Sequence, residues 1–264
     1  MSLQQEIIKR LGVKPVIDVD EEIRRRVDFL KEQVKAARTT GLLIAISGGI
    51  DSAVTTGLCK RATDELTQET GQPYMTLGVF QPYGKQEDIE HSYEVAKAFG
   101  LEHTVETNIE EAVDEIALEV EHSLKNIGQS RHLSPQGKGN VKARTRMVMQ
   151  YALAFELTLL VVGTDHASEA ITGFYTKWGD GAVDVTPLSS RTRGARGRGR
   201  PGRTAHLPAG GVDAGTASVS GAGIASVVSA AGIASVSAAT RWARLRRRGR
   251  GVPHATSRTV VARK

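Results

Sequence analysis

LLIAISGGIDSAV, residues 42–54, joins a short apolar run to a helical pattern through a turn that contains two glycines. A buried strand that turns in this way into a helix directs backbone N–H groups toward one point, where the helix dipole adds positive charge. The hydroxyl groups of Ser47 and Ser52 supply further donors. The stretch therefore predicts a strand, a phosphate-binding turn and a helix, in that order.

Asp51 gives this turn a more specific meaning. Its carboxylate would repel a bare phosphate, but Mg²⁺ is bound by one or two carboxylates together with water and substrate phosphates. The loop is not a Walker A motif, because no Gly-Lys-Ser/Thr follows the glycines. The residues thus favour a site for magnesium pyrophosphate, and a plain glycine turn before a helix is the alternative.

Outward from this turn, strand and helix patterns alternate. Apolar or β-branched runs recur as MTLGVF (75–80), HTVET (103–107) and LTLLVVG (157–163), mostly followed by helical stretches, and a helix is expected from Asp20 to about Arg38. Short apolar strands that alternate with helices are typical of parallel sheets. We therefore predict an α/β fold, a doubly wound parallel sheet with flanking helices.

The composition changes after Ser189. Residues 190–264 hold fourteen Arg, one Lys and a single acid, Asp213, whereas residues 1–189 carry 20 basic and 28 acidic side chains. All five Phe and all five Tyr precede residue 190. We expect one folded domain at 1–189 and a low-complexity basic tail at 190–264. Because the folded part is acidic, no nucleic acid is expected as its partner.

A second motif occurs where the 157–163 strand ends. VGTDHASEAITGFYTKWGDG (162–181), together with SGGIDS, PYGKQED (82–88) and NVKARTRM (140–147), resembles the ammonia-dependent NAD synthetases. These enzymes are part of the SGGxDS ATP pyrophosphatase superfamily, whose fold is adenine nucleotide alpha hydrolase-like. The resemblance covers about residues 1–188.

The resemblance implies roles for particular residues. Mg²⁺ would be held by Asp51 and Glu169, and deamido-NAD would be bound by Arg144, Lys177 and Asp184. No catalytic residue is assigned, and His166 is given no role beyond capping a turn. Contacts to ATP are expected from Ala45, Ile46, Ser47, Gly48, Gly49, Ile50, Asp51, Ser52 and Thr164.

The implied reaction is the last step of NAD biosynthesis. ATP, a co-substrate, would adenylate the nicotinate carboxylate of deamido-NAD, and ammonia would then displace AMP to give NAD. Free ammonia is expected as the nitrogen source, although a separate glutaminase partner stays open. The resemblance also implies a homodimer. The single Cys59 and the absence of a signal peptide or membrane span lead us to expect a cytoplasmic protein.

The tail departs from the family pattern. Family members continue after Pro187-Leu188-Ser189 with a Lys that reaches ATP, a Thr in a Pro-Thr-Ala-Asp loop and a late His-Lys pair for deamido-NAD. This sequence has none of them in the expected setting. A reading-frame shift near Ser189 or Ser190 is one hypothesis. The alternatives are a truncated, inactive homologue that binds only ATP, and a tail that binds polyanions. A related pyrophosphatase, which makes GMP, thiolated tRNA or argininosuccinate, is a further alternative.

Overall fold

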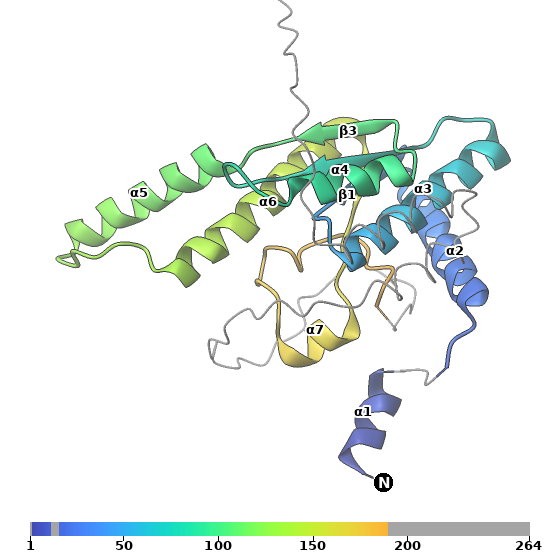
Figure 1. The fold of residues 1–264 in the computed structure, drawn as a ribbon, viewed down its shortest axis with the longest axis horizontal. Coiled ribbons are helices and arrows are strands. Elements are labelled where there is room, and N and C mark those ends of the chain that lie inside the picture. Colours follow the sequence, from blue (N-terminus) through green and yellow to red (C-terminus); the bar gives the residue numbers. More distant parts are fainter. Residues whose placement is uncertain (1, 12–15, 190–264) are drawn as a thin grey trace, which may run out of the picture.

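The computed structural model describes residues 2–11 and 16–189, which form a parallel sheet covered by helices (Figure 1). Its strands are β1 (Gly41–Ala45), β2 (Met75–Phe80), β3 (His103–Glu106) and β4 (Leu159–Val162), in the order β3-β2-β1-β4. All three pairings are parallel. The predicted α/β fold with a parallel sheet is confirmed. A parallel bridge between Val162 and Val185 extends the sheet beyond β4.

Helices precede, connect and follow the strands. They are α1 (Leu3–Leu11), α2 (Val19–Ala37), α3 (Ile50–Thr70), α4 (Ile89–Ala98), α5 (Glu110–Asn126), α6 (Pro135–Leu157) and α7 (Ala167–Thr172). Figure 1 shows that α5 and the first half of α6 project together beyond the sheet, whereas α7 lies below it.

The two faces of the sheet have separate cores, as expected for strands whose side chains alternate. Leu42 and Ile44 of β1 pack with α2, α3 and α4 on one face. Leu43, the residue between them, packs with Val161 of β4 and Ala154 of α6 on the other face. The central strand β1 is therefore buried on both sides, and its carboxyl end is fixed relative to α3 and α6.

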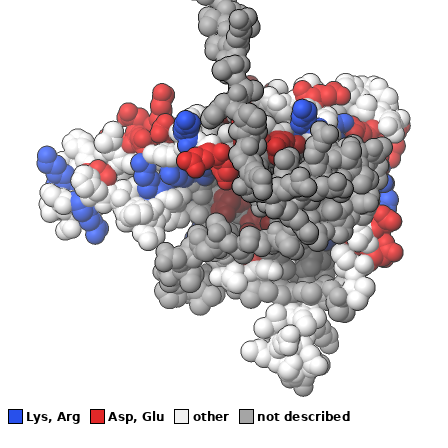
Figure 2. Space-filling model, viewed as in Figure 1, with Lys and Arg blue, Asp and Glu red and all other residues white. Residues whose placement is uncertain are grey.

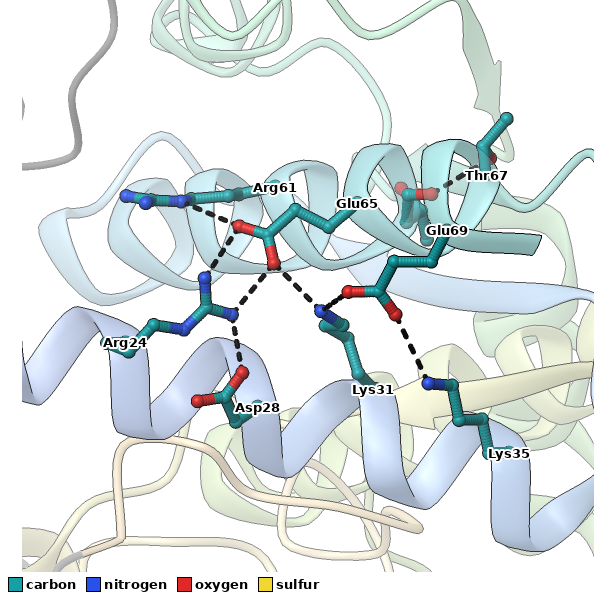
Figure 3. A network of polar contacts seen from close by, with 9 residues as sticks. Arg24, Asp28, Lys31, Lys35, Arg61, Glu65, Thr67 and Glu69 are labelled. Carbon is teal, nitrogen blue, oxygen red and sulfur yellow. Dashed lines mark hydrogen bonds and ion pairs between the residues drawn. The ribbon is translucent and has the colours of Figure 1, made fainter. Parts of the chain in front are cut away.

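An ion-pair network fastens α2 to α3 (Figure 3). Both oxygens of Glu65 accept hydrogen bonds from the Arg24 guanidinium, each at 2.8 Å, and further bonds come from Lys31 at 2.9 Å and Arg61 at 3.2 Å. Lys31 also contacts Glu69. Arg24, followed by Lys31 and Arg61, lowers the pKa of Glu65 to about 2. This network holds the helix that follows the SGGIDS turn against α2.

Several element boundaries differ from the prediction, and two of the differences have a clear physical reason. The first long helix begins after Asp18, not at Asp20, because the Asp18 carboxylate accepts the N–H of Glu21 at 3.0 Å as an N-cap. Leu157 belongs to the end of α6, and Thr158 caps that helix in the left-handed conformation at φ 55°. The fourth strand therefore starts at Leu159, two residues later than its apolar run suggests.

The predictions for residues 190–264 lie outside the described residues. Of the helices within the described ranges, none combines the length and the apolar character that crossing a membrane requires.

Candidate functional site

The predicted phosphate-binding turn lies at the carboxyl end of β1, where α3 begins. The hydroxyl of Ser52 donates to the Gly49 carbonyl at 3.0 Å and lies 3.3 Å from the Ser47 N–H and 3.2 Å from the Ser47 hydroxyl. Gly49 is the residue before the helix, and no side chain caps it. The first N–H groups of a 21-residue helix are thus available to an anion.

Glycine is required at the first of the two positions in this turn. Gly48 has φ 77°, and a Cβ atom there would come within 2.9 Å of the His91 Cβ and 3.2 Å of the Ser92 backbone nitrogen. The turn therefore packs closely against the first turn of α4, which lies on the same side of the sheet as α3. The contact with α4 fixes one side of the turn, and Ser47 and Gly49 remain exposed.

The structure brings the two predicted magnesium ligands together. The His166 Nε2 atom lies 3.9 Å from an oxygen of Asp51 and 3.9 Å from an oxygen of Glu169. Asp51 comes from the first turn of α3, and Glu169 comes from α7, whose start follows β4. The His166 backbone N–H donates to Glu169 at 3.2 Å, which is half of a capping box. His166 stands at the N-cap position of α7, where the Glu169 carboxylate accepts its backbone N–H.

Two carboxylates fit the chemistry of Mg²⁺, which usually keeps several waters and takes substrate phosphates as ligands. Among residues 2–11 and 16–189, His, Cys, Asp and Glu side chains form no cluster of three or more suited to a metal. An all-protein cage would suit other ions better. A pair of carboxylates beside a phosphate-binding turn is what a nucleotide-bound Mg²⁺ uses.

Two of the predicted deamido-NAD residues also meet. The Arg144 guanidinium of α6 donates to the Lys177 carbonyl at 3.2 Å, and both side chains are exposed. Nearby, Gly179 is buried, and a Cβ atom there would lie 3.0 Å from the Ala143 Cβ. The loop after α7 is therefore docked on α6 with two cations at its rim.

The other predicted site residues have separate places. Asp184 is held within the fold, because it accepts the Val161 N–H at 2.8 Å and the Tyr151 hydroxyl at 3.1 Å. Thr164 is half-buried and lies two residues after the end of β4. Ala45 and Ile46 lie at the end of β1, where Ile46 donates to the Val79 carbonyl at 2.9 Å. Ile50 opens α3.

Asp165 has a perturbed acidity that the sequence did not indicate. Burial, together with the nearby carboxylates of Asp180 and Glu169, raises the pKa of Asp165 to about 6. Asp180 in turn accepts the Thr176 N–H at 2.8 Å and so helps to shape the loop after α7. Acidic groups thus gather on the β4 side of the site, where a bound cation would relieve their repulsion.

Sequence reasoning also missed a polar cluster formed by Gln81, Arg146 and Gln150. Gln81 directly follows β2 and is only 7% exposed, and it exchanges hydrogen bonds with Arg146 of α6. A glutamine directly after an apolar strand could have indicated a polar cluster at this position. Its partner, however, is 65 residues away in the sequence.

Comparison with known proteins agrees with this arrangement. The family model described as NAD synthase matches residues 22–195. An NH(3)-dependent NAD(+) synthetase from Nocardia farcinica is 46% identical over 193 residues, which are 73% of this chain and 68% of that protein.

Solved structures give the same result. An NAD+ synthetase from Burkholderia pseudomallei superposes with a TM-score of 0.62 at 30% identity, covering 71% of this chain and 68% of that one. An NMN synthetase from Francisella tularensis superposes with a TM-score of 0.54 at 28% identity, covering 66% and 65%. With its turn after β1, its acidic residues after β4 and these relatives, the chain belongs to the NAD synthase family.

Proposed function

We propose that the chain is a ligase that makes NAD from deamido-NAD, ATP and ammonia, with release of AMP and pyrophosphate. The observation that carries the proposal is the meeting of the SGGIDS turn with Asp51 and Glu169 at one edge of the sheet. Family membership and relatives named for this reaction support it. The match ends near residue 195, so the proposal concerns the part of the chain up to there.

The reaction has two steps that this site suits. An oxygen of the nicotinate carboxylate attacks the α-phosphorus of ATP, and the bond to pyrophosphate breaks. Ammonia then attacks the carboxyl carbon of the adenylate, AMP leaves, and the nitrogen loses a proton. Such chemistry depends mainly on alignment of the reactants and on stabilisation of the developing charge.

The proposed ATP site consists of the end of β1, the turn and Thr164. The N–H groups at the start of α3 and the hydroxyls of Ser47 and Ser52 would bind the phosphates. Asp51 and Glu169 would hold Mg²⁺, which when bound would neutralise charge on the pyrophosphate. We propose no residue that takes the proton from nitrogen.

The proposed acceptor site is the loop after α7 and the facing side of α6. Arg144 and Lys177 would bind phosphate groups of deamido-NAD, because both side chains are exposed cations and the Arg144 guanidinium is hydrogen-bonded to the Lys177 backbone carbonyl. Asp184 would hold a ribose hydroxyl. Since its oxygens already serve Val161 and Tyr151, its contact with a ligand would use the remaining acceptor capacity of a carboxylate.

A homodimer and a cytoplasmic location are part of the same proposal. Large apolar side chains are exposed on α5 and α6: Ile116 (45%), Leu118 (59%), Val148 (59%) and Phe155 (84%). Figure 2 shows that the end formed by α5 and the first half of α6 combines uncharged surface with basic and acidic side chains on the face in view. Apolar surface of this kind often marks an interface between proteins. The cytoplasmic location rests on the single Cys59, which excludes an internal disulfide.

The choice of acceptor is open to a direct experiment. Amide formation with ATP, Mg²⁺ and ammonium would be followed by mass spectrometry, as NAD made from deamido-NAD or as nicotinamide mononucleotide made from nicotinate mononucleotide. The second acceptor is included because an NMN synthetase is among the structural relatives. We expect amidation of deamido-NAD and little of the mononucleotide. The reverse preference would overturn the proposed substrate but keep the reaction class.

A variant pair connects the reaction to the site. Asp51→Asn keeps the size of the side chain but removes its charge, and we expect NAD formation to fall about 100-fold or more, as for loss of one group that stabilises developing charge. The control is Asp64→Asn, which changes an exposed carboxylate on the same helix, paired with Lys60. Equal activity of the two variants would contradict the proposed magnesium site.

A further inference from the structure

Arg146 is held by one side of its guanidinium group. Its Nε–H donates to the Gln81 carbonyl at 3.0 Å, and the Gln81 side-chain amide donates back to the Arg146 carbonyl at 3.2 Å. Gln150, one turn along α6, donates to the side-chain oxygen of Gln81 at 2.7 Å. The Gln81 carbonyl and both polar atoms of its side chain are thus hydrogen-bonded, and together the three residues fix where the guanidinium lies.

The charge of Arg146 has no close counterpart. Within residues 2–11 and 16–189, its terminal nitrogens Nη1 and Nη2 donate to no protein acceptor and no carboxylate forms an ion pair with it. The side chain is half-buried. Burial lowers the pKa of Arg146, and the more distant Asp180 opposes that effect. Burial of a cation without a nearby anion costs free energy, so such a group usually binds an anion in the functional state of a protein.

The place of Arg146 indicates which anion this is. Ala45 pairs with Val79 and the Ile46 N–H donates to the Val79 carbonyl, so Ser47, where the turn begins, and Gln81 both follow the same end of the two paired strands. Arg146 rests on the carbonyl of that same Gln81. Its free nitrogens therefore lie at the carboxyl ends of β1 and β2, the edge at which ligands bind in open parallel sheets.

We propose that Arg146 is a further ATP-binding residue, whose Nη1 and Nη2 atoms donate to phosphate oxygens of the triphosphate held by the Ser47–Ser52 turn. The proposal rests on the proposed function. A guanidinium fork matches two oxygens of one phosphate, and the bond to Gln81 presets its orientation, so little side-chain freedom is lost on binding. Gln81 and Gln150 are positioning residues that act through Arg146.

The experiment measures binding, so that it does not depend on turnover. Magnesium pyrophosphate, MgATP and deamido-NAD would each be titrated calorimetrically into the full chain, into Arg146→Gln and into Arg146→Lys. Arg38→Gln is the matched control, since Arg38 is exposed and caps α2 three residues before β1, at the opposite edge of the sheet. Thermal unfolding of each variant reports whether the fold is kept.

We expect Arg146→Gln to weaken binding of pyrophosphate and ATP about 10- to 100-fold, the effect of losing a charge-assisted hydrogen bond, with partial recovery in Arg146→Lys. Deamido-NAD binding should change far less. Affinities equal to those of Arg38→Gln would overturn the proposal, as would a loss confined to deamido-NAD or a lower Tm with unchanged affinities. If Arg146→Gln does not fold, the test uses Arg146→Lys: weaker binding of pyrophosphate and ATP than in Arg38→Gln supports the proposal, and equal binding overturns it. A wild-type chain that binds neither phosphate probe would contradict the proposed function itself.

Discussion

The stability of the protein should depend on pH through Asp165, because the pKa of this residue, about 6, lies above the usual value for an aspartate in an unfolded chain. Between these two values the folded protein binds the proton more tightly than the unfolded chain does. The free energy of unfolding should therefore fall as the pH rises from about 4 to about 6 and stay level above that range, as far as this group is concerned. Asp165→Asn carries no charge and should not show this fall.

The measurement is Tm from pH 4 to pH 7 for the wild type and Asp165→Asn. The difference between the two proteins at each pH removes the effect of other titrating groups. We expect the variant to gain a few degrees relative to the wild type between pH 4 and pH 6. A difference that does not change with pH would show that the carboxyl group of Asp165 titrates as in an unfolded chain.

Single residues also show how far the sequence alone could reach. Ser47, Gly48, Gly49 and Asp51 are neighbours in the chain, so the strand, the turn and the helix start could be predicted from their order. The pairing of Arg146 with Gln81 joins residues 65 positions apart. Only the packing of α6 on the sheet brings them together, and no local pattern encodes that packing. The same is true of Asp165 and Asp180, whose mutual effect depends on the path of the loop between them.

At the scale of elements, the α2–α3 network predicts acid sensitivity. Because the folded pKa of Glu65 is about 2, its contribution to stability is complete above the unfolded value of 4.5 and is lost as the pH falls from there toward 2. Glu65→Gln should remove this contribution at neutral pH. Water screens the outer side of the network, so we expect a loss of about 1–2 kcal/mol.

Urea unfolding at pH 7 and pH 3 tests this prediction, with Glu32→Gln as the control, since Glu32 is exposed on the same pair of helices but lies outside the network. The free energy of unfolding of Glu65→Gln should be lower than that of the control at pH 7, and the two should approach each other at pH 3. An equal gap at both pH values would assign the loss to packing and not to charge.

The elements themselves could largely be predicted, since four apolar runs gave four strands. The error at Leu157 and Thr158 has a physical cause. Their apolar and β-branched side chains fit a strand, but α6 continues through Leu157 because its Ala154 packs under the sheet. Packing decided between helix and strand where local preference could not.

At the scale of the whole molecule, the exposed apolar residues of α6 predict self-association. Val148 and Phe155 are seven residues apart and therefore lie on one stripe of the helix. Phe155→Asp would place a charge on this stripe and should convert a dimer into a monomer, at a cost of about 1–3 kcal/mol or more in association. Sedimentation equilibrium at several protein concentrations measures this.

Glu156→Gln is a suitable control, because Glu156 is the exposed neighbour of Phe155. We expect it to keep the wild-type assembly. A wild-type chain that sediments as a monomer at all concentrations would contradict the proposed homodimer, whereas a dimer that survives Phe155→Asp would place the interface elsewhere on the molecule.

The strand order β3-β2-β1-β4 has a consequence for the growing chain on the ribosome. The central strand, β1, is the first of the four strands to be synthesised, whereas its neighbour β4 is the last. The hydroxyl of Thr40, just before β1, donates to the carbonyl of Thr158, which is 118 positions later in the chain. Until β4 emerges, one side of β1 is an open edge with unpaired backbone groups, a template for aggregation. The nascent protein is therefore exposed to edge-to-edge aggregation until residues 159–162 have left the ribosome and paired with β1.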